Sequence, residues 1–251
     1  VVALFMLPFS ACALDTLVIT DDFTSADIQT VGSLFIEGAQ ELNFEKVRNL
    51  PPADFTPLLE TGVSFSASKK VYWVKFYVEN ETNDKRNLML AIENPRINKL
   101  QVLFENEKKV VDSLMRSGDY LPFNERMVQH RHFVFPVEVL AGEVKAVYLY
   151  ADKYAENIRL LISVYDHDYF YETDQKAIFL WSIYLGFLVF FCVLTLIASL
   201  VLREKVVFYF LMYSIFIVLN SFAWLGYGFQ YIWSDYPYFH NICGNLFIIL
   251  S

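Results

Sequence analysis

The chain has 251 residues, of which 55% are hydrophobic and 18% aromatic, and a formal net charge of −8. Soluble globular proteins typically contain about 45–50% apolar residues, so an ordinary soluble composition is excluded. The charged residues after position 176 are two of each sign, Arg203, Glu204, Lys205 and Asp235, so the excess negative charge lies in residues 1–176. An acidic N-terminal part disfavours nucleic acid and anionic lipid as its ligands.

Residues 1–13 predict a signal peptide. They form an apolar run that ends in Ala11-Cys12-Ala13, the small-x-small pattern of a cleavage site, and we expect cleavage after Ala13. A buried first strand is the alternative. The other cysteines are Cys192 and Cys243, so residues 14–168 have no disulfide framework and no cysteine-rich metal site.

Residues 14–68 carry weaker signals. Residues 16–20 and 33–36 suit strands, and residues 43–49 suit a short helix that ends before Pro51-Pro52. Residues 53–60 contain Pro57 and predict a loop or one helical turn.

From residue 71 onward, short apolar segments alternate with polar breaks rich in Asn, Asp, Pro and Gly. Strands without intervening helices predict an all-β domain over residues 14–168, a β-sandwich of the jelly-roll, galactose-binding-like type. The predicted strands are residues 71–78, 88–93, 99–104, 109–115, 131–139, 144–150 and 158–165.

Residues 169–251 predict a membrane part. Residues 177–202 carry no charge, and about 26 helical residues are roughly 39 Å long, enough to cross an about 30 Å hydrocarbon core. After the charged turn, a second span is expected over 206–231 and a third from 241 to 251, where the chain stops within the span. The basic residues Arg203 and Lys205 predict a cytoplasmic turn, and therefore a multi-pass membrane protein with its N-terminal domain on the outer side of the membrane.

The predicted strand 71–78 has two unlike faces. Tyr72, Val74, Phe76 and Val78 alternate on one side and should face the core. Trp73, Lys75 and Tyr77 point the other way, and two aromatic rings beside a cation suit stacking against a sugar. The alternative is that Trp73 and Tyr77 pack beneath a loop or the N-terminal segment.

A second group of candidate ligand-binding residues follows Gly118. Arginine offers a planar fork of donors and aspartate an acceptor, as polyol or carboxylate ligands require. Hydrogen bonds that order the loop are the alternative role. The group consists of Asp119, Arg126, Arg131 and His132.

The same segment holds a possible metal motif. His130-x-His132 would place two imidazoles on one face of a strand, but no third ligand is evident, so surface histidines are favoured. We predict no cofactor and no metal site. The sequence also lacks a P-loop, a nucleophile elbow and an HExxH motif, so no catalytic residue is expected in this chain.

Several strings resemble the bacterial seven-transmembrane receptors with diverse intracellular signalling modules (7TMR-DISM). They are VYWVKFYVEN at 71–80, SGD at 117–119, PF at 122–123 with Arg126, HRHFVFP at 130–136, YLGF at 184–187, FYFLMY at 208–213 and GYG at 226–228. The resemblance covers roughly residues 14–251. It implies a location in the bacterial inner membrane, a periplasmic jelly roll that binds carbohydrate or another small ligand, seven helices, a homodimer, and a cytoplasmic kinase or cyclase module in the same full-length chain.

The first functional hypothesis is therefore a membrane sensor that binds a small ligand, with carbohydrate as one candidate, and signals through its helices. A membrane-anchored glycan-binding module without signalling is the second hypothesis. A membrane enzyme or transporter with a β-sandwich accessory domain is the third.

Overall fold

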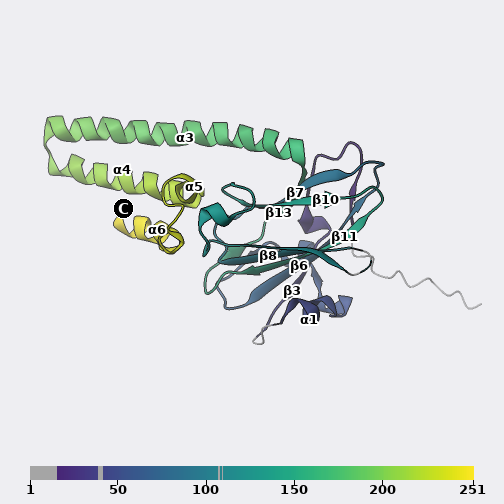
Figure 1. Cartoon of the computed structure of the whole chain (residues 1–251). Coiled ribbons are helices and arrows are strands. Elements are labelled where there is room, and N and C mark those ends of the chain that lie inside the picture. The colour runs from purple at the N-terminus through teal and green to yellow at the C-terminus, as the bar shows by residue number, and fades with distance from the viewer. Residues whose placement is uncertain (1–15, 39–41, 107, 109) are drawn as a thin grey trace, which may run out of the picture.

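A computed structural model describes residues 16–38, 42–106, 108 and 110–251. It contains a β-sandwich followed by long apolar helices (Figure 1). The predicted fold class is therefore confirmed. The predicted signal peptide, with Cys12, lies outside the described residues.

The larger sheet has seven strands in the order β4-β3-β6-β11-β8-β9, and β1 pairs in parallel with β6. Strand β6 is central because it pairs with β11 along one edge and with β1 and β3 along the other. The strands are β1 Thr16–Ile19, β3 Ser33–Ile36, β4 Thr56–Pro57, β6 Val71–Asn80, β8 Lys99–Glu105, β9 Val111–Ser117 and β11 Val144–Asp152.

The second sheet has four antiparallel strands in the order β10-β7-β13-β2, and a separate pair is formed by β5 and β12. The bounds are β2 Ser25–Asp27, β5 Ser64–Phe65, β7 Arg86–Ile92, β10 Phe133–Val139, β12 Ile158–Arg159 and β13 Ile162–Asp166. Each of the seven strands predicted after residue 70 is present. The last one, predicted over 158–165, is divided into β12 and β13.

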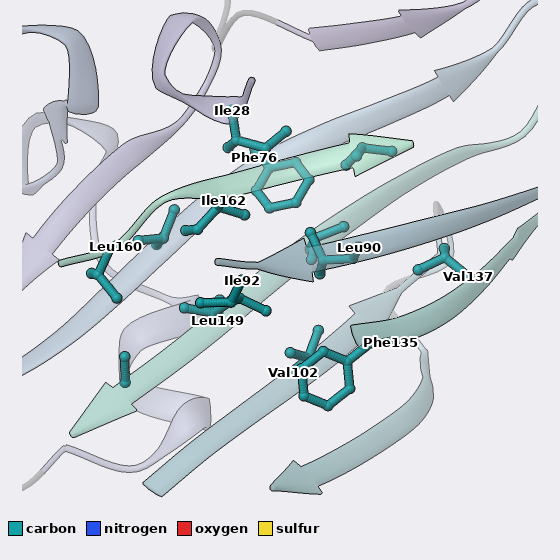
Figure 2. Packing of buried hydrophobic residues seen from close by; sticks show 14 of the residues in the cluster. Ile28, Phe76, Leu90, Ile92, Val102, Phe135, Val137, Leu149, Leu160 and Ile162 are labelled. Atoms are coloured by element: carbon teal, nitrogen blue, oxygen red, sulfur yellow. The ribbon is translucent and has the colours of Figure 1, made fainter. Parts of the chain in front are cut away.

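The core lies between the two sheets, where the buried side chains of both inner faces interdigitate (Figure 2). Tyr72, Val74, Phe76 and Val78 of β6 all belong to it, which confirms the core face predicted from their alternation. From the opposite sheet, residues such as Leu90 and Phe135 pack against them.

Short helical elements lie before β6. Helix α1 covers Phe44–Arg48, and Asn43 caps it by accepting a hydrogen bond from Lys46 N at 3.1 Å. The helix predicted over 43–49 is thus confirmed, with its two end residues serving as caps. The other short elements are α2 Leu58–Thr61 and the 3₁₀ turns η1 Ile28–Thr30, η2 Pro52–Asp54 and η3 Phe123–Glu125.

The C-terminal part is helical, with α3 at His167–Leu202, α4 at Lys205–Trp224, α5 at Tyr227–Tyr231 and α6 at Pro237–Leu250. Helices α3 and α4 lie side by side: α3 extends away from the sandwich and α4 returns toward it (Figure 1). In the described part of the chain, these two are long and apolar enough to cross a membrane. The helix predicted over 206–231 ends earlier, at Trp224, because the chain turns at Gly226, whose φ of 81° glycine adopts readily.

Candidate functional site

Trp73 lies on the outer face of the larger sheet, as its position in β6 predicts, but it is only 3% exposed. Residues of the segment 42–55, including Val47 of α1, cover it together with Tyr148. Its indole Nε1 donates a hydrogen bond to Glu37 Oε2 at 3.2 Å. The ring is therefore packed beneath the N-terminal segment and is not available to stack on a sugar, because α1 occupies that face.

Lys75 and Tyr77 lie farther along the same face and remain partly exposed. Lys75 Nζ lies 5.3 Å from the ring centroid of Tyr77 and 5.1 Å from that of Tyr148. Burial opposes the charge of Lys75, but the two tyrosines outweigh that effect and raise its pKa. Lys75 and Tyr77 line a cavity of about 380 Å³ with Arg48 and Glu105, which form an ion pair.

The other four predicted residues converge at a different place, where the sandwich meets the helices. We call this region the junction. It comprises residues 93–98, 118–132 and 153–159 of the sandwich together with the N-terminal turns of α3, the C-terminal end of α4, α5 and the first turns of α6. Residues separated by more than 100 positions, such as Asp119 and Asn241, form hydrogen bonds there.

Asp119 is fully buried at the junction. Its Oδ1 accepts hydrogen bonds from Asn98 Nδ2 at 3.0 Å and from Asn241 Nδ2 at 3.3 Å. Asn98 also donates to Asn241 Oδ1 at 3.0 Å, so one polar network joins the head to α6. Gly118, with φ of 149°, permits this approach, because a Cβ there would lie 2.2 Å from Asn98 O.

Two buried cations flank this network. Lys153 Nζ lies 4.0 Å from Asp119 Oδ2, and Arg96 Nη2 donates to Asn241 O at 3.0 Å. The guanidinium of Arg96 also lies 4.9 Å from the ring of Trp224 in α4. Burial raises the pKa of Asp119 and lowers that of Lys153, because each charge is removed from water.

Arg126 is enclosed by aromatic rings. Its guanidinium lies 4.8 Å from Phe123, 4.2 Å from Phe133 and 5.5 Å from Phe229 of α5. Nη1 donates to the backbone oxygens of His130 and Arg131 at 2.8 and 2.9 Å. Burial lowers the pKa of Arg126 to about 9. These contacts order the loop and attach it to α5.

His130 and His132 are not the surface histidines that the sequence favoured. His130 is buried, with Nε2 3.0 Å from Asp174 Oδ1 of α3, and Arg131 Nη2 lies 3.3 Å from the same oxygen. Burial lowers the pKa of His132 to about 3, with the neighbouring Arg131 adding to the effect. Within the described ranges, no three His, Cys, Asp or Glu side chains are grouped so as to hold a metal.

Two cavities open at the junction. One of about 760 Å³ is lined by Arg96, Lys153 and Arg159 from the sandwich and by Trp224 from α4. The other, of about 590 Å³, lies against α3 and includes Arg131 and His132. Both volumes are in the range of small-molecule sites, about 300–1,000 Å³.

Several junction residues were missed by the sequence analysis. Arg96, Asn98 and Lys153 stand beside strand ends among many similar polar residues, so no local pattern distinguishes them. Asn241 carried a detectable signal, because it is, with His240 and Asn245, a polar residue in a mostly apolar helix.

Solved structures with partial similarity include a galactanase and a xylosidase. An exo-beta-1,3-galactanase from Phanerochaete chrysosporium, solved with beta-1,3-galactotriose, matches at 11% identity and a TM-score of 0.26, over 57% of this chain and 28% of that one. A GH31 alpha-xylosidase from Xanthomonas citri matches at 10% identity and a TM-score of 0.24, over 54% of this chain and 15% of that one. No curated protein matches the sequence.

One family model matches the sandwich itself. It is described as 7TMR-DISM extracellular 2 and covers residues 30–165, which is 136 of the 251 residues. The matched segment includes both sheets apart from β1, β2 and the last residue of β13, and it contains all seven predicted ligand-binding residues. Because the match spans more than half of the chain, this protein belongs to the 7TMR-DISM extracellular 2 family.

Proposed function

We propose that the chain is the sensing part of a receptor in the bacterial inner membrane, which binds a small polar ligand with its periplasmic head and transmits the binding event through its helices. The cytoplasmic output module expected in the full-length protein would receive the signal. The family match supports a membrane receptor with an extracellular sensor domain.

The observation that carries the proposal is the buried polar network between head and helices. Asn241 of α6 bonds to Asp119 and Asn98, and Asp174 of α3 pairs with Arg131. Buried polar groups pay a large penalty when they lose their partners, so movement of the head loops must be accompanied by movement of the helices. A ligand that prefers one arrangement would shift the balance between arrangements.

The ligand class follows from which residues remain accessible. Sugar stacking was predicted from Trp73 and Tyr77 together, and the burial of Trp73 leaves Tyr77 as the single available ring of that pair. Carbohydrate therefore stays one candidate among small polar ligands. The junction cavities offer charged side chains together with exposed aromatic rings, Trp224 in both and Trp181 in the second.

The experiment uses the full chain in nanodiscs. Small polar molecules are screened by thermal shift, and a stabilising molecule is then tested by hydrogen–deuterium exchange. A receptor predicts altered exchange both in residues 118–132 of the head and in residues 237–244 of α6. A glycan-binding anchor predicts changes in the head alone, and that result would contradict signal transmission.

Orientation is tested separately, because the proposed periplasmic head rests on Arg203 and Lys205 in the turn between α3 and α4. Single cysteines are placed at Arg116 on β9 and at Glu204, with the native cysteines changed to serine. A membrane-impermeant maleimide should label R116C in spheroplasts and E204C only after permeabilisation. The reverse pattern would overturn the proposed topology.

A further inference from the structure

The cavity of about 760 Å³ at the junction lies between the sandwich and the helices. Residues from the β7–β8 loop and the segment after β11 form one wall, and Trp224 of α4 with Asn245 of α6 forms another. A molecule bound there would contact both parts of the protein at once.

Charge is distributed unevenly around this cavity. Among the residues that the structure describes, the buried lysine and arginine side chains are Arg96, Arg126, Arg131 and Lys153, and all four lie at the junction. The buried carboxylate that lies at the junction with these cations is Asp119, and Asp174 is mostly buried beside Arg131. In a chain with a net charge of −8, positive charge is thus concentrated where water is excluded.

Two of these cations belong to residues that line the cavity, Arg96 and Lys153, which are 6% and 4% exposed. Arg96 Nε donates no hydrogen bond to any residue in the described ranges, whereas Lys153 Nζ has carboxylate oxygens of Glu156 at 3.2 Å and of Asp119 at 4.0 Å. Burying a charged donor without an acceptor is costly, so Arg96 Nε indicates a missing acceptor. Arg159 is exposed and adds a third positive charge to the lining.

Two carboxylates face the same space. Glu156 Oε2 lies 3.2 Å from Lys153 Nζ, and its side chain is 40% exposed. Glu93 is exposed and accepts a hydrogen bond from Tyr165 at 2.8 Å. Glu156 therefore screens Lys153 while the cavity is open, and an anion would compete with it for the ammonium group.

We propose that this cavity binds a small organic anion whose carboxylate or phosphate oxygens accept hydrogen bonds from Lys153 Nζ and Arg96 Nε. Arg159 provides a third cation for the same ligand. The proposal depends on the receptor function for its biological meaning, and it names the class of ligand that the receptor would sense. Because Arg96 also contacts Asn241 and Trp224, an anion bound to it would act directly on α6 and α4.

The bound oxygens could come from a soluble anion or from a lipid headgroup, because Trp224 ends a helix that is apolar enough to cross the membrane. The experiment separates these sources. Succinate and inorganic phosphate are titrated by calorimetry into the full chain in phosphatidylcholine nanodiscs at constant ionic strength. In a second arm, retention of phosphatidylglycerol on the protein is measured by native mass spectrometry.

Three variants test whether each charged side chain strengthens or weakens anion binding. R159Q should weaken binding about twofold to fivefold, the range of an exposed ion pair. E156Q should strengthen it by a similar factor of about two to five, because the competing carboxylate is removed. R116Q, which alters an exposed arginine on β9 outside the cavity lining, is the matched control and should leave binding unchanged.

K153M should reduce binding more than about tenfold, because it removes a charged hydrogen-bond donor. If K153M does not fold, R159Q and E156Q decide, since both alter partly exposed side chains. The proposal is supported if a soluble anion binds, R159Q weakens its binding and E156Q strengthens it. It is also supported, with a lipid as the source of the anion, if the protein retains phosphatidylglycerol and R159Q retains less of it. The absence of binding in both arms, or affinities that R159Q and E156Q leave unchanged, would overturn it.

The outcome also separates this inference from the receptor proposal. Anion binding with the expected variant effects, but without altered exchange in residues 237–244, would retain the site and reject signal transmission. A different ligand that alters exchange in α6, together with no anion binding, would retain the receptor and reject the anion site.

Discussion

The substitution Asn241→Leu tests whether the head and α6 are energetically linked. Asn241 Nδ2 donates to Asp119 O at 3.2 Å and to Asp119 Oδ1 at 3.3 Å, and Asn241 Oδ1 accepts from Asn98 Nδ2 at 3.0 Å. Leucine has a similar size but can make none of these bonds. The variant should therefore loosen the head loop while leaving α6 able to pack.

The expected magnitude follows from the bonds that are lost. A hydrogen bond to a charged group contributes about 1.5–3 kcal/mol, and one between neutral amides about 0.5–1.5 kcal/mol. The bonds to Asp119 are long and Asn241 is partly exposed, so we expect the lower part of the sum, about 2–3 kcal/mol. Because about 1.4 kcal/mol changes an equilibrium constant tenfold, this loss corresponds to roughly 30- to 150-fold faster hydrogen exchange through opening of the head loop.

The assay is native-state hydrogen exchange in nanodiscs. The amide of Asp119 donates to Ile97 O at 2.7 Å, so a peptide covering residues 117–121 reports the opening of this loop. The control is Thr195→Val, because the Thr195 hydroxyl bonds to Phe191 O in its own helix at 2.7 Å. Exchange in N241L within about threefold of wild type would refute the link.

Three further predictions concern single side chains. Trp73→Ala should destabilise the head by about 3–5 kcal/mol, measured by chemical denaturation, because Trp73 is packed beneath α1. Acid should destabilise wild type between pH 6.5 and about 3 in thermal melts, because His132 has its pKa lowered from 6.5 to about 3 and so binds a proton only when unfolded. His132→Phe should reduce that slope. Gly226→Ala should lower stability by about 1–2 kcal/mol in the same melts, since φ is 81° and the added Cβ would crowd Arg131 at 3.2 Å.

Each of these has its own control. His167→Phe alters an exposed histidine and should retain the acid slope, so equal slopes in H132F and wild type would contradict the assignment to His132. Gly186→Ala lies in α3 with open space around the added Cβ, and it should not lower stability, because alanine favours a helix more than glycine does. A folded W73A protein of wild-type stability would contradict the structural role of Trp73.

Local patterns predicted the sandwich well. The strands after residue 70 and the core face of β6 follow from period-two alternation, because each side chain's face is fixed by its position in the strand. Helix α1 was also predictable, since Asn43 and the prolines after Asn49 act on neighbouring residues. The second helix was predicted too long, because Gly226 lies in an apolar run that hydropathy alone cannot divide.

For the candidate site, the sequence identified residues but not their surroundings. Asp119, Arg126, Arg131 and His132 were singled out as polar groups in one loop, and they do lie together. Their contacts with α3, α5 and α6 were not predictable, and neither was the cover that α1 places over Trp73.

The sequence by itself determined the partition of the chain into a β-rich acidic part and an apolar helical part, and it determined which face of β6 forms the core. These properties depend on residues only a few positions apart. Only the tertiary structure decided that Asp119 meets Asn241 across 122 positions, and that Arg96 and Lys153 share one cavity with Trp224. Packing brings those residues together, and no local periodicity encodes which distant polar groups will be buried against each other.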